Sequence, residues 1–347
     1  MIDLDKKILE SLTSLGLVEP EYDGVARIPT GSLSLDFVLG GGLPRGRITT
    51  IIGPPSFGKT TLALIVASTI VQSTAMRNGG KVAFYDMEHT FDYPWAAQLG
   101  IQPDKLMLFH PDTGEQAMEG IGQLVENALC DLIIVDSVAE TKFTAEAEGS
   151  FADMHVGLAA RRWSQFCRKI KADLDASGVA LLMINQVRYK IGVSFGDPRT
   201  EFGGEALKFA ASIRIEMLKP QQTELSIIFR YKSDKNKTAN TFGRKGETEL
   251  IRNVPQPFVS VVHEIVELGK ELGVFTREDG KSISSGGYWY FKGEKLALGA
   301  PQMRKLLMDD RNLRMATEQT IRDIISQSTY IDWKGNHDGE DELSGDD

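Results

Sequence analysis

The chain has 347 residues, of which 41% are hydrophobic and 25% charged, a composition typical of a globular protein with one large core and an accessory domain. Its net charge of −9 excludes a simple basic protein that coats DNA, because neutralising phosphates requires clustered Lys and Arg. Cys130 and Cys167 are too few for a disulfide framework and lack zinc-site spacing, which favours a reducing cytoplasm. No apolar run approaches 18 residues, so neither secretion nor a membrane span is expected.

The first segment, residues 1–27, is predicted to contain a short amphipathic helix. Its apolar residues recur at three- and four-residue steps, at Leu4, Ile8, Leu12 and Leu15. One apolar stripe does not reveal whether the helix packs on its own domain or on another subunit.

A core domain, residues 28–260, is predicted from the alternation that follows. Strand-like runs are separated by segments of helical spacing, at residues 47–52, 81–85, 132–135 and 179–184. This βαβ pattern predicts an α/β fold in which helices cover both faces of a mostly parallel sheet. Ligands are expected at the carboxyl ends of the strands.

After residue 210 the pattern changes to shorter strand candidates, Ile213–Met217 and Leu225–Tyr231, and then to a stretch containing Gly, Pro and Lys up to about Pro257. A boundary near residue 260 is therefore predicted. Residues 261–333 combine two helix candidates with an aromatic strand, as in a small α+β domain. Residues 334–347 end in DGEDELSGDD, whose acids predict a disordered tail.

A phosphate-binding loop is predicted where the sequence GPPSFGKT fits the pattern G-x-x-x-x-G-K-[ST] between a strand and a helix candidate. The predicted nucleotide contacts here are Gly53, Pro54, Pro55, Ser56, Phe57, Gly58, Lys59, Thr60 and Thr61. Backbone N–H groups can close around phosphate, Lys59 can reach the outer phosphates, and Thr60 can ligate Mg²⁺. Asp136, at the end of the apolar run LIIVD, is the predicted second Mg²⁺ contact.

Hydrolysis also needs a group that orients water toward the γ-phosphate. Asp86 and Glu88, just after the second strand, are equal candidates from the pattern, and either could instead cap the next helix. Lys235 and Lys237 form a K-x-K motif that, from the pattern alone, indicates a solvated loop.

Several longer motifs, in a fixed order, resemble those of the RecA recombinases. They are GSLSLD at 31–36, PDTGEQA at 111–117, GLAAR at 157–161 and INQVR at 184–188, with weaker similarity through YFKGEK at 290–295. By this resemblance Glu88, not Asp86, activates water, and Gln186 senses the γ-phosphate. Lys235 and Lys237 then reach the ATP of a neighbouring subunit.

The resemblance also implies that Asp92 and Trp95 contact the nucleotide, with Trp95 stacking on adenine where the family commonly has tyrosine. Two DNA-binding loops are implied, at about residues 145–156 and 188–204. The predicted DNA contacts are Val156, Arg161, Arg168, Arg188, Lys190, Ile191, Arg199, Gly203 and Gly204. Arg161 and Arg168, seven residues apart, share one helix face, which suits either DNA contact or a plain charged surface.

Besides Trp95, the chain departs from the family pattern in three places. The segment before Ile28 is shorter than usual, Val156 replaces a methionine, and Arg199 replaces an acid. The short segment puts part of the expected polymerisation contact in doubt, whereas the extra charge of Arg199 should favour phosphate binding.

We therefore expect an ATP- and Mg²⁺-dependent recombination and repair protein that forms helical filaments on single-stranded DNA and pairs it with double-stranded DNA. Single-strand-binding and mediator proteins are candidate further partners, and the expected location is the cytoplasm. Two alternatives remain open. A hexameric helicase shares the phosphate-loop core, and an ATP-gated DNA scaffold would lack strand exchange.

Overall fold

The computed structural model describes residues 24–144, 158–189, 199–201, 204–283 and 286–327. Several sequence expectations lie outside these residues. They are the N-terminal amphipathic helix, the first DNA loop with Val156, the acidic tail, and the DNA contacts Lys190, Ile191 and Gly203. Within the described part of the chain, no helix is long and apolar enough to cross a membrane.

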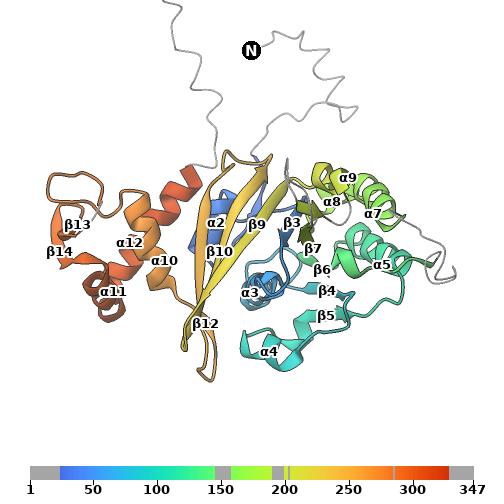
Figure 1. Ribbon diagram of the computed structural model, residues 1–347, viewed down its shortest axis with the longest axis horizontal. Coiled ribbons are helices and arrows are strands. Elements are labelled where there is room, and N and C mark those ends of the chain that lie inside the picture. The colour runs from blue at the N-terminus through green and yellow to red at the C-terminus, as the bar shows by residue number, and fades with distance from the viewer. Residues whose placement is uncertain (1–23, 145–157, 190–198, 202–203, 284–285, 328–347) are drawn as a thin grey trace, which may run out of the picture.

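A mixed sheet runs through the middle of the molecule (Figure 1). Its strands are neighbours in the order β12-β11-β10-β9-β3-β7-β6-β4-β5, and β8 pairs with β7. The strands from β9 to β5 run parallel, whereas β10, β11 and β12 run antiparallel to their neighbours. The bounds are β3 Ile48–Gly53, β4 Val82–Asp86, β5 Leu106–Phe109, β6 Leu132–Asp136, β7 Ala180–Tyr189, β8 Arg199–Glu201, β9 Ile213–Gln222, β10 Ser226–Asn236, β11 Lys245–Ile251 and β12 Phe258–Val259. The expected α/β fold is confirmed.

Each face of this sheet has its own apolar cluster, because successive side chains of a strand point to opposite faces. On β4, Val82 and Phe84 belong to one cluster, whereas Ala83 and Tyr85 belong to the other. Helices α2, α3 and α4 pack on the first cluster, and α5, α7, α8 and α9 pack on the second. Their bounds are α2 Leu33–Leu39, α3 Lys59–Gln72, α4 Tyr93–Gln98, α5 Gly114–Glu126, α7 Leu158–Lys169, α8 Lys171–Ser177 and α9 Gly204–Ala210. Burial on both faces explains why the parallel strands are continuous apolar runs in the sequence.

Three short elements complete the core. Strands β1 (Arg27–Ile28) and β2 (Leu43–Pro44) form an antiparallel pair on either side of α2 in the sequence. One 3₁₀ turn (Pro103–Lys105) precedes β5, and another (Val138–Glu140) follows β6.

The antiparallel strands differ from those predicted from the sequence. Strands β9 and β10 have 10 and 11 residues, so they are longer than predicted, and Lys235 lies within β10, not in a loop. The stretch before Pro257 contains β11, which was not predicted. Buried and more exposed positions alternate along these strands, and their charged exposed residues disguise the strand pattern in the sequence.

The arms of the predicted second DNA loop, residues 188–204, are also strands. Strand β7 continues to Tyr189 and pairs with β8, with Tyr189 opposite Arg199 and Arg188 opposite Thr200. Gly204 begins α9. Within the described residues, the ends of the predicted loop therefore belong to β7, β8 and the start of α9.

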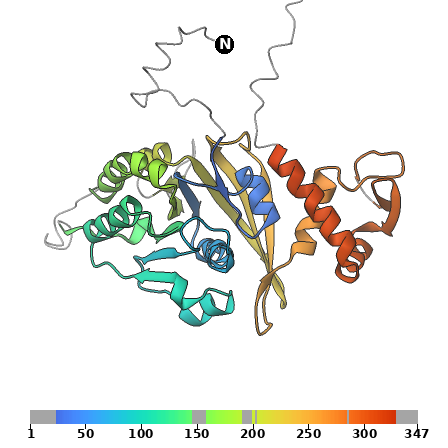
Figure 2. The ribbon, with the colours of Figure 1, turned by 180° about the vertical axis from the view of Figure 1, so that it is seen from behind.

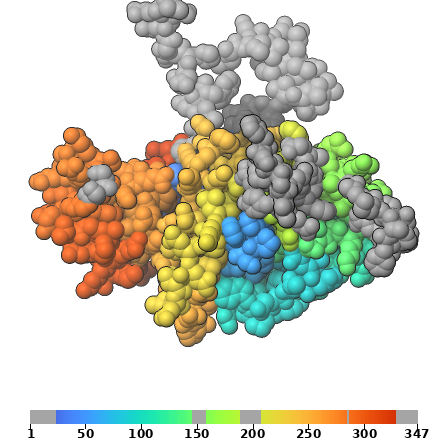
Figure 3. Space-filling model, in the orientation of Figure 1, coloured from blue at the N-terminus to red at the C-terminus, as the bar shows by residue number. Residues whose placement is uncertain are grey.

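The chain after residue 260 forms a lobe beside the antiparallel strands. Ser260 caps its first helix by accepting a hydrogen bond from His263 N at 3.4 Å. The elements are α10 Val261–Glu271, β13 Tyr288–Phe291, β14 Glu294–Leu298, α11 Gly299–Asp309 and α12 Arg311–Gln327. Figure 2 shows α12 next to α2, and Figure 3 shows the lobe in orange and red at one end of the molecule. Its buried residues, such as Ile265 and Ile321, belong to the same apolar cluster as α2.

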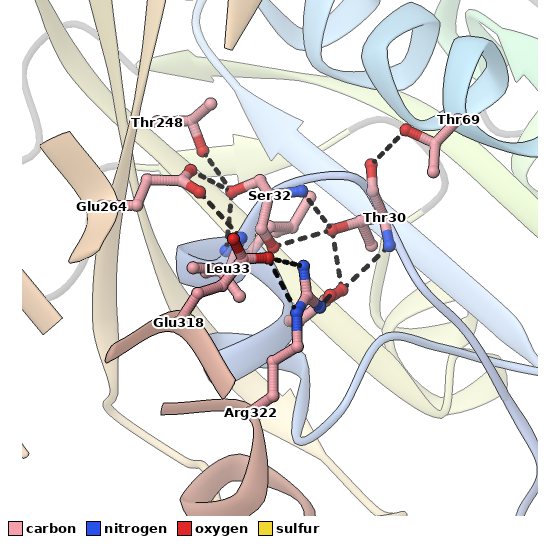
Figure 4. Close-up of polar contacts among 10 residues, drawn as sticks. Thr30, Ser32, Leu33, Thr69, Thr248, Glu264, Glu318 and Arg322 are labelled. Atoms are coloured by element: carbon pink, nitrogen blue, oxygen red, sulfur yellow. Dashed lines mark hydrogen bonds and ion pairs between the residues drawn. The ribbon is translucent and has the colours of Figure 1, made fainter. Parts of the chain in front are cut away.

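A buried polar network joins this lobe to the core (Figure 4). The Glu264 carboxylate of α10 accepts hydrogen bonds from Ser32 Oγ at 2.5 Å and from Leu33 N at 2.8 Å, both at the start of α2. Burial raises the pKa of Glu264 to about 7, although the hydrogen bonds from Ser32 and Leu33 oppose that rise. Nearby, Arg322 of α12 lies 4.0 Å from the Asp36 carboxylate. Helix α2 is therefore held by both α10 and α12.

Candidate active site

The predicted site residues follow the carboxyl ends of adjacent parallel strands. Gly53 pairs with Gln186, and Asp86 pairs with Asp136, so the ends of β3, β7, β4 and β6 lie at one edge of the sheet. A cavity of about 530 Å³ opens there. It is lined by Pro55, Ser56, Gly58, Lys59, Thr60, Thr61, Glu88, Trp95, Asp136, Gln186, Ile227, Phe229, Leu250 and Arg252. In Figure 3 the blue start of α3 reaches the surface between the yellow strands and the cyan segment of α4.

The loop between β3 and α3 is shaped by a glycine that no other residue could replace. Gly58, the N-cap of α3, has φ 84, and a Cβ atom there would lie 2.1 Å from the Phe229 ring. Ser56 also has a positive φ of 64. The turn therefore aims the first backbone N–H groups of α3 at the cavity, as an anion-binding helix start requires.

Lys59 closes this loop from inside. Its ammonium donates to the carbonyl oxygens of Gly53 at 3.1 Å and Pro54 at 2.8 Å. These two residues therefore act through their carbonyl groups and do not line the cavity, while Phe57 packs against the apolar core. Burial lowers the pKa of Lys59, and the carboxylates of Asp136 and Glu88 oppose that change. The result is a buried cation at the cavity wall with weak carbonyl partners that an anion could replace.

Thr60 and Asp136 form the second part of the site. The Thr60 hydroxyl donates to Asp136 Oδ2 at 2.5 Å. Burial raises the pKa of Asp136 to about 6, while the Thr60 hydrogen bond lowers it. A hydroxyl and a buried carboxylate side by side are hard oxygen ligands of the kind that Mg²⁺ prefers, so these residues fit a magnesium site completed by phosphates and water.

Glu88 and Asp86, which the sequence pattern left equal, have different surroundings. Glu88 lines the cavity, and its Oε1 accepts hydrogen bonds from Ser137 Oγ at 2.8 Å and Gln186 Nε2 at 3.3 Å. Asp86 is buried, accepts from Phe91 N at 2.9 Å, and does not line the cavity. Glu88 is thus the carboxylate that faces the space where a substrate would bind.

Trp95 and Asp92 lie at the start of α4, but only Trp95 lines the cavity. The Asp92 side chain caps this helix by accepting from Trp95 N at 2.9 Å. Trp95 lines the cavity, whereas Asp92 is not among the lining residues. Asp92 thereby fixes the helix turn that carries the indole.

One wall of the cavity was missed by the sequence analysis. Ile227 and Phe229 come from β10, Leu250 from β11, and Arg252 follows β11. No motif marks these residues, because their proximity to the phosphate loop arises from strand order and not from spacing along the chain. The structure alone shows that the ring of Phe229 occupies the space that the missing Cβ of Gly58 leaves.

Lys235 and Lys237 do not line this cavity. Strand β10 runs antiparallel to β9, so Ile227 is at the cavity edge and Lys235 is eight residues away, about 26 Å along the strand. Lys235 donates to the carbonyl oxygens of Lys208 at 2.5 Å and Phe209 at 3.4 Å. Burial, helped by Lys237 and other cations, lowers the pKa of Lys235 to about 8. The lysines thus lie at the opposite edge of the sheet from their own chain's cavity.

The described DNA candidates lie elsewhere. Arg161 and Arg168 are exposed on α7, on the side opposite the buried Trp163 and Cys167. Arg188 and Arg199 belong to the hairpin of β7 and β8. Strand β7 connects this hairpin directly to Gln186 in the cavity.

Comparison with known proteins agrees with this arrangement. The family defined by the RecA N-terminal domain matches residues 4–253. The chain belongs to the RecA family. Protein RecA of Acidothermus cellulolyticus is 41% identical over 312 residues, which cover 88% of this chain and 86% of that protein. Protein RecA of Kineococcus radiotolerans is 40% identical over 322 residues, or 91% and 88% of the two chains. Protein RecA of Legionella pneumophila is 41% identical over 305 residues, or 86% and 83%.

Membership in the RecA family establishes the general function of the chain. The chain is a DNA recombination and repair protein that catalyses strand exchange, and its enzymatic activity is that of a DNA-dependent ATPase. Family membership implies nucleotide binding, DNA binding and filament formation.

Proposed function

We propose that the cavity binds ATP with Mg²⁺ and that this chain, as a filament on single-stranded DNA, hydrolyses ATP while it pairs that strand with duplex DNA. The observation that carries the proposal is the meeting, in one cavity, of the phosphate loop, the Thr60–Asp136 pair and Glu88. Phosphate, metal and water would then each have a binding group within the same space.

The roles within the cavity follow from the chemistry of each group. Lys59 exchanges its carbonyl partners for phosphate oxygens, while Thr60 and Asp136 hold Mg²⁺. The metal, when bound, supplies positive charge that neutralises the phosphates. Glu88 accepts a proton from the attacking water, and the hydrogen bond from Ser137 keeps its carboxylate oriented for this step.

Gln186 is proposed to couple the nucleotide to DNA. Its side-chain amide donates to Glu88 at 3.3 Å and to Glu140 at 3.4 Å, so its hydrogen bonds would rearrange when a γ-phosphate arrives beside Glu88. Three residues later, at Tyr189, the same strand ends at the hairpin that bounds residues 190–198. Strand β7 thus connects the proposed phosphate sensor with the predicted DNA loop.

Lys235 and Lys237 are proposed to contact the ATP of a neighbouring subunit. Their position about 26 Å along β10 from the cavity wall excludes a role at their own site, but it suits an exposed surface that faces another protomer. Hydrolysis would then require assembly, and once it has occurred it would weaken the contacts between subunits and with DNA.

The DNA itself is proposed to contact the loops and the cations around them. Single-stranded DNA would meet Arg161, Arg168, Arg188 and Arg199 together with Val156, Lys190, Ile191, Gly203 and Gly204. The arginines and Lys190 bind phosphates, and Ile191 separates bases. Base pairing, and not the protein, reads homology.

Two variants in the cavity test the proposal, because they separate binding from hydrolysis. Lys59→Ala should lose ATP binding, ATPase activity and strand exchange. Glu88→Gln should keep ATP-dependent filaments on single-stranded DNA and lose most ATP turnover, since only the proton acceptor is removed. A three-strand exchange assay, run beside ATPase and filament imaging, separates the alternatives: closed rings would indicate a helicase, and normal filaments without exchange a scaffold. Undiminished ATPase in Glu88→Gln would remove Glu88 from its role.

The shared site has its own test, in which two inactive proteins are mixed. Subunits carrying Glu88→Gln and subunits carrying Lys235→Ala with Lys237→Ala should form some interfaces in which both halves are intact. ATPase activity should therefore recover above that of either protein alone. A mixture that co-assembles and stays inactive contradicts a site shared between protomers.

A further inference from the structure

Glu140 contacts the proposed phosphate sensor but belongs to none of the motifs found in the sequence. Its Oε1 accepts a hydrogen bond from Gln186 Nε2 at 3.4 Å. The side chain is exposed, and within the described residues its carboxylate accepts no other hydrogen bond. Surface contacts of this kind add little to the stability of a fold, so the main effect of this contact falls on Gln186.

The backbone that carries Glu140 is fixed. Glu140 is the last residue of the 3₁₀ turn after β6, and its N–H donates to Ser137 O at 3.2 Å. The residues around it are anchored in the core, because Val138 is fully buried and Thr141 Oγ1 accepts a hydrogen bond from Trp163 Nε1 at 3.2 Å. Only the side-chain torsions of Glu140 therefore have to be ordered when it makes its contact.

The same turn also contacts Glu88. Ser137 Oγ donates to Glu88 Oε1 at 2.8 Å, and Gln186 Nε2 donates to the same oxygen at 3.3 Å. A side-chain amide has two N–H groups, so the bonds to Glu88 and Glu140 use the whole donor capacity of Gln186. A phosphate oxygen can accept a hydrogen bond from this amide only if one of the two bonds is given up.

The two carboxylates differ in their position relative to the cavity. Glu88 lines it, whereas Glu140 is not among the lining residues. An amide that turns toward a phosphate in the cavity stays beside Glu88 and leaves Glu140. Glu140 thus stabilises only the arrangement in which Gln186 does not contact phosphate, and a contact made in one of two states shifts the equilibrium toward that state.

The contact also joins the segments that lead to the two predicted DNA loops. The first loop, from about residue 145, begins five residues after Glu140, and residues 190–198 of the second begin four residues after Gln186. The strands that precede them, β6 and β7, are neighbours in the sheet. DNA bound to both loops would therefore act on both ends of this hydrogen bond.

We propose that Glu140 is a positioning residue that holds the Gln186 amide away from the γ-phosphate and so limits ATP hydrolysis in the absence of DNA. This inference rests on the proposed role of Gln186 as phosphate sensor. Without DNA, the bond to Glu140 favours the arrangement seen in the structure. When ATP is bound, DNA on the two loops opposes that bond and the amide turns to the phosphate.

The test measures ATP hydrolysis by the full-length protein with and without single-stranded DNA. Glu140→Ala should raise the rate without DNA about fivefold, as expected for the loss of one hydrogen bond, and leave the rate at saturating DNA unchanged. Glu140→Asp keeps the charge but is one methylene shorter, so it should behave as Glu140→Ala does. Glu140→Gln keeps an acceptor at the same reach and should keep the low rate without DNA.

DNA binding gives a second readout that does not depend on hydrolysis. Coupling between two sites is reciprocal, so Glu140→Ala should bind a labelled single strand about fivefold more tightly than the wild type in the presence of ATPγS. With ADP the two proteins should bind equally, since ADP offers the amide no γ-phosphate. Fluorescence anisotropy measures both affinities.

Glu115→Ala is the matched control. Glu115 accepts hydrogen bonds from Thr144 N at 3.2 Å and Thr144 Oγ1 at 3.3 Å, in the segment that follows Glu140, and within the described chain it has no hydrogen bond with Gln186. Its variant should hydrolyse ATP as the wild type does. An equal rise in Glu115→Ala would mean that any loosening of this segment has the effect, and the contact with Gln186 would lose its role.

A double substitution tests whether Glu140 acts through Gln186. Glu140→Ala should have no effect in a protein that already carries Gln186→Ala, and an additive effect would show that Glu140 acts through another group. Wild-type rates and DNA affinity in Glu140→Ala would refute the proposal, and a wild-type rate in Glu140→Asp would make the effect one of charge and not of contact. Full stimulation by DNA in Gln186→Ala would instead refute the proposed phosphate sensor.

Discussion

Glu264 provides a quantitative prediction, because its carboxyl group is 1% exposed at the junction of α10 with α2. Burial raises its pKa from 4.5 to about 7. In the unfolded chain the group titrates near its ordinary value, so the folded state binds the proton more tightly. The resulting stabilisation is fully present below pH 4.5 and is lost as the pH rises through about 7. Each tenfold difference in proton affinity corresponds to about 1.4 kcal/mol, so the loss amounts to about 3 kcal/mol.

Glu264→Gln isolates this effect. The amide has the same shape, can accept from Leu33 N and can donate to Ser32 Oγ, but it does not titrate. Between pH 5 and pH 8, the free energy of unfolding of the wild type should fall relative to that of the variant by about 3 kcal/mol, measured by urea denaturation. Asp36, whose pKa burial raises to about 6, titrates in both proteins and therefore contributes little to the difference.

A matched control lies on the same helix. Glu267, more exposed and paired with Arg304 at 2.8 Å, should give a Glu267→Gln variant with the pH dependence of the wild type. The reasoning fails if Glu264→Gln and the wild type lose stability in parallel from pH 5 to pH 8. In that case Glu264 would be ionised at little cost, with its hydrogen bonds to α2 offsetting burial.

Three further predictions concern the cavity. Gly58→Ala should abolish nucleotide binding, because the new Cβ would lie 2.1 Å from Phe229, whereas Gly79→Ala, with a similar φ of 76 and open space around it, should bind as the wild type in the same titration. Gln186→Ala should bind ATP normally but lose most of the stimulation of ATPase by DNA, which a comparison of rates with and without single-stranded DNA would detect. Trp95→Ala should weaken ADP binding about tenfold or more, and Trp95→Phe much less, since a base stacks on either aromatic ring; equal losses in both would contradict stacking.

The parallel half of the fold could be predicted from the sequence because burial on both faces demands apolar residues at nearly every position. The predicted run at 132–135 is β6 less its last residue, Asp136, and all five residues of β6 are buried. The start of α3 was equally clear, since its glycine, lysine and threonine are required by local backbone geometry and charge. Such features depend on neighbours within a few positions along the chain.

The antiparallel half of the sheet was harder to predict from the sequence, because its strands are determined by contacts with segments that are distant along the chain. Strand β11 begins with Lys245 and contains two glutamates, and its alternating exposure tolerates these charges. Its residue Leu250 reaches the cavity only because β10 and β9 stand between β11 and β3. The two oxygens that hold the Arg252 side chain, the carbonyl of Thr223 and the side-chain oxygen of Gln222, likewise belong to residues about 30 positions earlier. No spacing rule along the chain predicts such contacts.

If Lys235 and Lys237 act on ATP as proposed, the same reversal of chain direction requires the site to be shared between two protomers. Because β10 runs back along β9, one strand contributes Ile227 and Phe229 to the cavity and carries Lys235 to the opposite edge of the sheet. The side chain of Lys235 could reach phosphates bound in its own chain's cavity only if β10 separated from β9. If Lys235 acts on ATP, it must act on the ATP of another copy whose cavity faces this edge. Such a head-to-tail contact, repeated from protomer to protomer, closes into a ring or continues as an open helix according to the rotation between neighbours, and membership in the RecA family implies the filament.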